Sequence, residues 1–227
     1  MPQIAVPMDV PPYRLSGAVY GALLNHNTTL QALGDAVNQP PYSGAPKAPV
    51  LYIKPRNTLA ASGEPVAVPR GIPELEIDAC LGLVIGRPAC RLSEDSALGH
   101  LAGYLIVDDV TVPHLSYYRP SIRFNARDGF CPMGPRVVSR EAIANPDALT
   151  VHVYVDGELK QTATTSQLVR PVAKLLADVT DFMTLSPGDV LAVGVGFPSP
   201  RVRAGQRVRI EIDGLGRLEN PFVAGAL

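Results

Sequence analysis

Proline and glycine recur along the whole sequence between short apolar runs, and no other feature limits the possible folds as strongly. The 227 residues include 23 prolines and 20 glycines, which separate the apolar runs instead of forming one low-complexity tract. Proline interrupts helices and central strands, and glycine permits tight turns. We therefore expect a mainly β chain of the α+β class, built from many short strands with frequent turns and few helices.

Period-two alternation and turn residues locate the expected elements. Asp156-Gly157 lies between two alternating stretches, which is a strong signal for a β-hairpin. Helical spacing is limited to a segment that begins at Ser93 and to residues 166–185, where Pro171 is expected to open the second part. The expected strands are 17–24, 50–53, 73–85, 102–109, 150–155, 190–195 and 207–212.

The chain is expected to divide into two unequal parts. Residues 38–49, NQPPYSGAPKAP, are rich in proline and predict a surface loop. We expect residues 1–49 to form a short N-terminal segment that packs on a main body made of residues 50–227.

Bulk composition argues against several classes of protein. With 46% hydrophobic and 18% charged residues the chain is expected to be globular, and its net charge of −1 gives no support for a nucleic-acid partner. Three cysteines without CxxC spacing predict neither a disulfide framework nor a structural zinc site. The N-terminus has no signal-peptide pattern and no apolar run approaches membrane-spanning length, so we expect a cytoplasmic protein without a membrane partner.

Four side chains that could carry chemistry lie at alternate positions before an apolar run. In ELEIDACLGLVIG (74–86) they are Glu74, Glu76, Asp78 and Cys80. Alternate residues of a strand share one face and lie about 6.6 Å apart, so two carboxylates at this spacing can converge on one metal ion. The spacing allows more than one such pair, and the solvated face of a sheet is the other interpretation.

Six sequence blocks are spread over nearly the whole chain: YIKPRNTLAASGEPVAVP (52–69), LGLVIGRPACRLSEDSAL (81–98), AGYLIVDDVT (102–111), NARDGFCPMGP (125–135), VYVDGELKQTATTSQL (153–168) and LSPGDVLAVGVG (185–196). In this order they resemble the fumarylacetoacetate hydrolase family. The resemblance implies a mixed β-sandwich or roll with short helices, usually dimeric. It also implies a Mg²⁺ or Mn²⁺ ion held by a Glu-x-Glu pair on one strand and by an aspartate after a Gly-Tyr step. Such an ion would polarise the carbonyl of a 2-oxo acid and stabilise its enolate.

Four shorter motifs are LNH (24–26), IKPRNT (53–58), SYYRPSI (116–122) and RDGFCPMG (127–134). They are similar to one branch of the family, the N-terminal half or separate small subunit of the isomerase/decarboxylases of homoprotocatechuate (4-hydroxyphenylacetate) catabolism. This branch implies a 2-hydroxyhepta-2,4-diene-1,7-dioate isomerase or 5-oxopent-3-ene-1,2,5-tricarboxylate decarboxylase system. Its substrate would be a small dicarboxylic or tricarboxylic oxo-acid. The assembly would be a homodimer, or a heterodimer with a homologous active subunit.

Gly86 aligns the acidic strand with the family pattern. The family's second glutamate lies six residues before this glycine, which is Cys80 here, and the first glutamate then matches Asp78. Asp109, which follows GYLIVD, matches the third carboxylate. The resemblance therefore makes Asp78, Cys80 and Asp109 the candidate metal ligands, although a thiol is a soft ligand that suits Mg²⁺ poorly. A two-residue slip would instead pair Glu76 with Asp78.

Other positions that serve active members of the family are also substituted. The resemblance implies a His and a Glu, three residues apart, on a short lid helix, and a Lys at the start of the NARDGF block. It further implies a Gly-Thr-Pro turn near the C-terminus and an Arg four residues after the third carboxylate. Lys54 remains as the candidate for binding a substrate carboxylate. The residues at the substituted positions are Thr29, Ala32, Asn125, the turn Gly194-Val195-Gly196 and Pro113.

Two functional hypotheses follow from these substitutions. The lost ligand and the lost base predict a partner subunit with a degenerate metal site, which acts beside an active homologue. The alternative is an autonomous metal-dependent decarboxylase or isomerase of the same family, with a modified site built from Asp78, Asp109 and Lys54. The sequence leaves both open, together with a ligand-binding or structural homodimer that serves another purpose.

Overall fold

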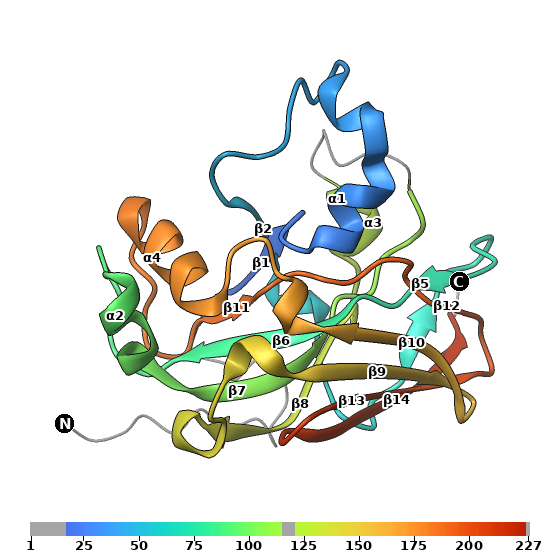
Figure 1. Ribbon diagram of the computed structural model, residues 1–227. Helices are drawn as coiled ribbons and strands as arrows, with labels where there is room; N and C mark the ends of the chain where they lie inside the picture. Colours follow the sequence, from blue (N-terminus) through green and yellow to red (C-terminus); the bar gives the residue numbers. More distant parts are fainter. Residues whose placement is uncertain (1–16, 115–120, 226–227) are drawn as a thin grey trace.

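The computed structural model describes residues 17–114 and 121–225, which fold mainly into β-strands joined by short helices (Figure 1). The α-helices are α1 (Asn27–Leu33), α2 (Glu94–Ala97), α3 (Ile122–Asn125) and α4 (Val172–Phe182). Short 3₁₀ helices cover Gly34–Asn38, Arg56–Thr58, Leu98–His100, Arg140–Ala142, Pro146–Ala148 and Thr165–Gln167. The strands are β1 (Val19–Leu23), β2 (Val50–Lys54), β3 (Leu59–Ala61), β4 (Val66–Val68), β5 (Leu75–Glu76), β6 (Ala79–Ile85), β7 (Leu101–Asp108), β8 (Cys131–Ser139), β9 (Thr150–Val155), β10 (Glu158–Thr164), β11 (Val190–Ala192), β12 (Arg201–Val202), β13 (Arg207–Ile212) and β14 (Gly216–Ala224).

The strands form two large sheets and one small one. The larger sheet has seven strands in the order β2-β1-β11-β6-β7-β8-β3, and the second has five in the order β10-β9-β13-β14-β4. Strands β5 and β12 form a separate two-stranded sheet. The seven-stranded sheet is mixed, because β1 runs parallel to β11 and antiparallel to β2. This confirms the expected mainly β chain with mixed sheets and short helices.

Alternation in the sequence accounts for the five-stranded sheet. In β9 every second side chain is buried, and in β13 the same pattern recurs, as expected for strands with one covered face. Asp156 and Gly157 both have positive φ, 51° and 84°, and they connect β9 to β10 as the expected two-residue hairpin. The buried residues of the two strands are Val151, Val153, Val155, Val208, Ile210 and Ile212.

Strand β6 is covered on both faces. All seven of its residues are buried. Leu81, Leu83 and Ile85 face the main core together with the five-stranded sheet and α4. Cys80 and Val84 belong to a second, smaller apolar cluster on the opposite face. The family-aligned position Cys80 therefore lies on the face of the second cluster.

The longest α-helix, α4, begins after Pro171 as expected. Its buried residues Val172, Leu175, Leu176 and Val179 recur at helical spacing and form one apolar face. Helix α2 follows Ser93, the expected N-cap, although the Ser93 hydroxyl makes no capping hydrogen bond and instead lies 3.0 Å from the Ser96 hydroxyl. The two helices lie together at the left of Figure 1.

The expected single strand over residues 73–85 is wrong, because the chain changes sheets within it. Residues 75–76 form β5 and pair with β12, where Glu76 lies opposite Arg201. The Ile77 N–H then donates to the Pro200 carbonyl at 3.0 Å, and the Asp78 carbonyl accepts from the Asp109 N–H at 3.1 Å. Only from Ala79 does the chain join the seven-stranded sheet. Residues 75–78 alternate between buried and half-buried side chains and residues 79–85 are all buried, and both patterns are typical of strands, so the pattern alone did not reveal the change of sheet.

The first part of the chain is tied into the larger sheet. Of residues 1–49 the structure describes 17–49, and β1 pairs with both β2 and β11 inside that sheet. The division of the chain at residue 49 stays a prediction. Within residues 17–114 and 121–225 no helix is both long and apolar enough to cross a membrane.

Candidate functional site

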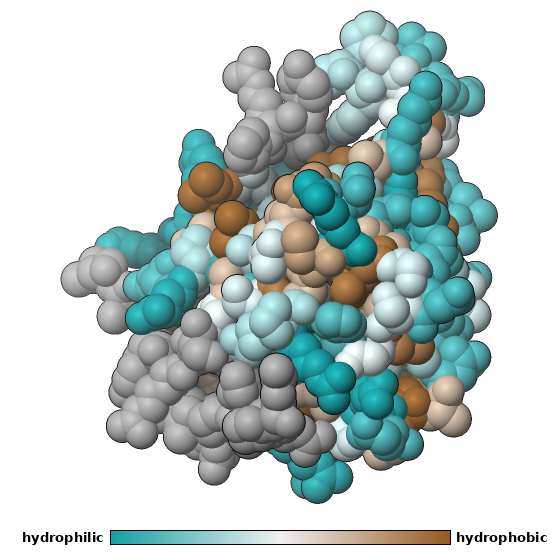
Figure 2. Space-filling model, turned by 90° about the vertical axis from the view of Figure 1, so that its left-hand side faces the viewer, coloured by the Kyte–Doolittle hydropathy of each residue, from teal (hydrophilic) through white to brown (hydrophobic). Residues whose placement is uncertain are grey.

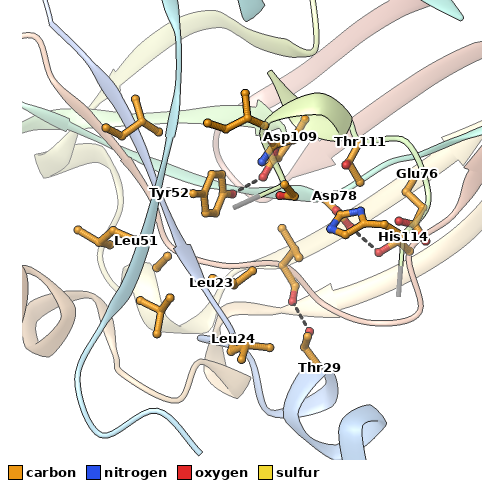
Figure 3. A pocket seen from close by; sticks show the side chains of 18 of the residues that line it. Leu23, Leu24, Thr29, Leu51, Tyr52, Glu76, Asp78, Asp109, Thr111 and His114 are labelled. Atoms are coloured by element: carbon orange, nitrogen blue, oxygen red, sulfur yellow. Dashed lines mark hydrogen bonds between the residues drawn. The ribbon is translucent and has the colours of Figure 1, made fainter. Parts of the chain in front are cut away.

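A cavity of about 610 Å³ lies between β1, β2, α3 and the loops that follow β5, β7 and β11. Figure 3 shows Tyr52, Asp78 and Asp109 close together in it, with leucine side chains on another wall. The cavity thus has a polar end and apolar walls. Its lining residues are Ala22, Leu23, Leu24, Thr29, Val50, Leu51, Tyr52, Ile53, Pro55, Glu76, Asp78, Asp109, Thr111, His114, Ser121, Ile122, Asn125, Val195, Phe197 and Ser199.

Asp109, which directly follows β7, has partners on both carboxylate oxygens. The Tyr52 hydroxyl donates a hydrogen bond to Oδ2, and the Lys54 ammonium forms an ion pair with Oδ1. Tyr52 and Lys54 are alternate residues of β2, so their side chains reach Asp109 from the same strand. The Asp109 carboxylate is therefore neutralised and hydrogen-bonded within the protein.

Lys54 is only 3% exposed and uses its ammonium group inside the protein. Besides Asp109, Nζ donates to the Val110 carbonyl at 3.2 Å and to the Asn125 carbonyl at 2.9 Å. Two backbone carbonyl oxygens thus accept hydrogen bonds from the ammonium group, and the Asp109 carboxylate is its ion-pair partner. The substrate-binding role of Lys54 stays a prediction, and it would require one of these contacts to be replaced.

Asp78 is a half-buried carboxyl group that lines the cavity close to Asp109. Its Oδ1 atom accepts a hydrogen bond from the Ser199 hydroxyl. Burial, and next the negative charge of Asp109, raise the pKa of Asp78 to about 7, although the Ser199 hydrogen bond acts in the opposite direction. Asp108, 1% exposed, shares this environment, and burial followed by the charges of Asp78 and Asp109 raises its pKa well above the usual value.

Cys80 does not line the cavity. It is 2% exposed and packs in the second apolar cluster with Val84, Val107 and Cys131. Burial, and next the charge of Asp109, raise the pKa of the Cys80 thiol well above its usual value. At neutral pH this side chain is a protonated thiol and brings no negative charge to the polar end of the cavity.

Glu76 and His114 line another part of the cavity, as Figure 3 shows. Glu76 forms an ion pair with Arg201 at 2.8 Å, and burial raises its pKa. The His114 ring stacks on Phe124 with ring centroids 5.0 Å apart, and its Nδ1 atom lies 3.0 Å from the Val112 carbonyl. Glu74 pairs with Arg201 at 3.4 Å and does not line the cavity.

The position of the expected lid base lies on α1. Thr29 reaches the cavity from this helix, and its hydroxyl donates to the Val195 carbonyl at 2.8 Å. His26 precedes the helix as its N-cap, and its ring contacts Thr28 and the Thr164 carbonyl, away from the cavity lining. Gly194, with φ +120°, passes so close to Asn25 that an added Cβ would lie 3.1 Å from the Asn25 Cβ.

Sequence reasoning did not identify Tyr52, Ser199 or His114 as site residues. For Tyr52 a signal existed, because it lies two residues before Lys54 on an expected strand and so shares its face. Ser199 lies between two prolines in a loop, and nothing local indicates its contact with Asp78. In the SYYRPSI motif, residues 116–120 lie outside the described part of the chain, and Ser121 and Ile122 line the cavity.

The candidate ligand set was compared with the needs of Mg²⁺ or Mn²⁺, which bind several oxygen ligands in preference to sulfur. Asp109 is engaged by Tyr52 and Lys54, Asp78 by Ser199, and Cys80 is a neutral thiol away from the cavity. Among residues 17–114 and 121–225 no group of three His, Cys, Asp or Glu side chains is placed to hold a metal ion. As arranged, the set does not fit a hard divalent cation. The metal-binding role of Asp78, Cys80 and Asp109 stays a prediction.

Comparisons with known proteins agree with the fold. The 4-hydroxyphenylacetate degradation bifunctional isomerase/decarboxylase of Escherichia coli is 38% identical over 209 residues, which are 92% of this chain and 48% of that protein. The chain thus spans about half the length of this curated relative.

Two solved structures of similar fold carry the names of enzymes that act on small organic acids. The 5-carboxymethyl-2-hydroxymuconate delta-isomerase of Mycobacterium smegmatis has a TM-score of 0.80 at 27% identity, covering 94% of this chain and 81% of its own. The maleylpyruvate hydrolase of Sphingobium sp. SYK-6, solved with manganese(II) and pyruvate, has a TM-score of 0.77 at 26% identity, covering 92% and 71%.

A sequence profile described as "Fumarylacetoacetate (FAA) hydrolase C-terminal" matches residues 18–223. This match covers most of the chain, including both large sheets and every cavity-lining residue named above. The chain therefore belongs to the fumarylacetoacetate hydrolase family.

Proposed function

We propose that this chain is the partner unit of an isomerase/decarboxylase of the 4-hydroxyphenylacetate type, and that a second family unit with intact acidic residues performs the metal-dependent steps. The observation that carries the proposal is the composition of α1. This helix contains no acidic or basic residue, and Thr29, its cavity-facing residue, donates its hydroxyl to a backbone carbonyl.

The chemistry of this class explains why that observation matters. Tautomerisation and decarboxylation of a 2-oxo acid pass through an enolate, which requires a base to move a proton and a positive group to stabilise the charge. Thr29 cannot act as a base at neutral pH. The Lys54 ammonium is directed at Asp109, Val110 and Asn125, all within the protein.

The lengths of the relatives support a second unit. This chain corresponds to 48% of the Escherichia coli isomerase/decarboxylase. A separate chain of the same family would supply the remaining length. Exposed apolar side chains are available for such an association, since Ile53 is 56% exposed and Phe182 is 60% exposed. Figure 2 shows apolar patches among polar side chains on one face of the molecule.

A second candidate function is an autonomous decarboxylase or isomerase. The cavity of about 610 Å³ that contains Asp78, Asp109 and Glu76 favours it, because a pocket of this size accommodates a small organic acid. In this case Asp78, Asp109 and Lys54 would form a modified site.

Purification of the chain alone and in a mixture separates the two functions. The partner would be a family chain that carries the Glu-x-Glu pair, and the assay would follow the ultraviolet absorbance of 2-hydroxyhepta-2,4-diene-1,7-dioate with Mn²⁺. We expect the rate of the chain alone to be about a hundredfold or more below that of the mixture, since a positioned general base contributes at least that much.

Light scattering on the same mixture should show a complex that contains both chains. Asp109→Ala leaves the buried Lys54 ammonium without its counter-ion and should lower the stability of this chain, but at a temperature at which circular dichroism shows the variant folded, the rate of the mixture should stay nearly unchanged. Substantial activity of the chain alone that disappears in Asp109→Ala would overturn the partner role and support the autonomous enzyme. Absence of both the complex and any gain in rate would also overturn it.

A further inference from the structure

The position of Tyr52 depends on a glycine in the neighbouring strand. Gly21 of β1 lies directly opposite Tyr52 of β2 in the antiparallel register. A Cβ atom at position 21 would overlap the Cζ and Oη atoms of Tyr52. Only glycine therefore lets the phenol ring lie across β1, and this brings the hydroxyl to the polar end of the cavity.

The Tyr52 hydroxyl lies beside Asp109 and Asp78, two of the three positions that the family pattern assigns to the metal ion. It donates a hydrogen bond to Asp109 Oδ2. Asp78 lines the same cavity, whereas Cys80 lies outside the lining and packs in the second apolar cluster. Figure 3 shows the phenol pointing at Asp109 beside Asp78.

The charges of this group balance without an added ion. The Lys54 ammonium compensates the Asp109 carboxylate in an ion pair that is buried on both sides. A site for a divalent cation needs several negatively charged oxygen ligands, which here would have to be freed from Tyr52, Lys54 and Ser199. Breaking a buried, hydrogen-bonded ion pair to admit an ion is costly.

We propose that the Tyr52 hydroxyl, admitted by Gly21, occupies the place of the divalent metal ion in this chain, so that Asp109 is a structural carboxylate held by Tyr52 and Lys54. The pocket binds Mn²⁺ tightly only when the hydroxyl is removed and long carboxylates replace Asp78 and Cys80. This inference concerns metal binding and does not rest on the partner role proposed above.

The test measures Mn²⁺ binding directly, by the loss of the electron paramagnetic resonance signal of free Mn²⁺ on titration with protein. Four proteins are compared: the natural chain, Tyr52→Phe, Asp78→Glu/Cys80→Glu, and the triple variant that combines all three changes. We expect one Mn²⁺ per chain in the triple variant, bound about tenfold or more tighter than in the double variant, a difference of about 1.4 kcal/mol. The natural chain is expected to leave Mn²⁺ free.

A matched control replaces a tyrosine of the adjacent strand. Tyr20→Phe, combined with Asp78→Glu/Cys80→Glu, removes a hydroxyl from β1 that does not line the cavity, and it should bind no better than the double variant. Binding of Mn²⁺ by the natural chain at one ion per chain, abolished in Asp109→Asn, would overturn the proposal. Equal affinity of the double and triple variants would overturn it too, as would absence of binding in a folded triple variant.

Glutamate at the buried position 80 carries a risk of misfolding, which circular dichroism would reveal. Crystals of the natural chain soaked in MnCl₂ then provide the deciding observation. A manganese anomalous peak on Asp109 contradicts the proposal. A Tyr52–Asp109 hydrogen bond in the density without that peak supports it. Neither result depends on the activity of a mixture, so failure here and failure of the partner role are distinguishable.

Discussion

At the scale of single residues, polar side chains that the core buries find their partners in distant segments. Asn25 is 3% exposed, and its side-chain amide donates to the Val193 carbonyl at 2.7 Å while its oxygen accepts from the Arg170 N–H at 2.9 Å. His26 is equally buried, and its Nδ1 atom accepts from the Thr28 N–H at 3.3 Å. Nε2 then carries the proton and donates to the Thr164 carbonyl at 3.2 Å. Both residues therefore fix the start of α1 against segments that are distant in the sequence.

His26 should make stability depend on pH. Burial lowers the pKa of His26 below the ordinary value of 6.5. Below about pH 6.5 the imidazole is therefore protonated more fully in the unfolded chain than in the folded chain, and the free energy of unfolding decreases as the pH falls. We expect urea unfolding to show this loss between pH 7.5 and pH 5 in the natural chain, relative to His26→Asn, which retains a capping side chain.

The buried carboxyl groups are present in both proteins of this comparison, so their contributions cancel in the difference. Asp78 has a raised pKa, so by itself it would make the folded chain more stable as the pH falls, which is opposite to the effect of His26. Identical pH slopes for the natural chain and His26→Asn would contradict the assignment of a neutral, buried His26.

At the scale of elements, packing of amphipathic segments explains most of the structure. Strands β9 and β13 bury alternate residues, and α4 buries residues three and four apart. Because of these two periods, each element has one apolar face, and the faces of β9, β13 and α4 pack in the same apolar core. Strand β6 differs, because both of its faces are covered, and its sequence accordingly reads as a continuous apolar run.

Helix α4 offers a matched pair of substitutions. Leu176 is fully buried in the main core, and Phe182, the last residue of the same helix, is 60% exposed. Leu176→Ala should lower the free energy of unfolding by about 2–5 kcal/mol, because it removes buried methyl groups and leaves a cavity. Phe182→Ala should have a much smaller effect, and urea unfolding of both variants measures the difference. Losses of equal size would contradict the orientation of α4.

At the scale of the whole molecule, the polar end of the cavity joins segments that are far apart in sequence. Lys54 connects β2 to the chain after β7 and to the Asn125 carbonyl of α3. Tyr52 and Asp109 are 57 residues apart, and Asp78 and Ser199 are 121 apart. The cavity therefore forms only when the larger sheet is assembled, and its polar contacts in turn stabilise that assembly.

Removal of the Lys54 ammonium should destabilise the whole fold. In Lys54→Met the Asp109 carboxylate stays buried without its counter-ion, and we expect a loss of about 3–5 kcal/mol in the free energy of unfolding. The control is Lys160→Met, which removes an exposed ion pair with Glu158 and should change stability little. The double variant Lys54→Met/Asp109→Asn should recover part of the loss. No recovery in the double variant would show that the buried charge is not the cause.

The extent to which the sequence predicts the site differs from residue to residue. The family pattern located Asp78 and Asp109, and both line the cavity. It also located Cys80, which lies outside the cavity lining because it packs with Val84, Val107 and Cys131 in the second apolar cluster. Tyr52 and Ser199 were missed, since a tyrosine in a strand and a serine in a loop are typical of many structures without a site.

The sequence by itself determined the alternation of β9 and β13, the Asp156-Gly157 hairpin and the start of α4 after Pro171, because these depend on neighbours a few residues apart. Only the tertiary structure decided that the segment 73–85 changes sheets at Ile77 and Asp78, and that Asp109 meets Tyr52 and Lys54. A periodic pattern reports which faces of an element are covered. Which buried side chains meet across two elements depends on how the sheets assemble, and the local sequence does not specify that.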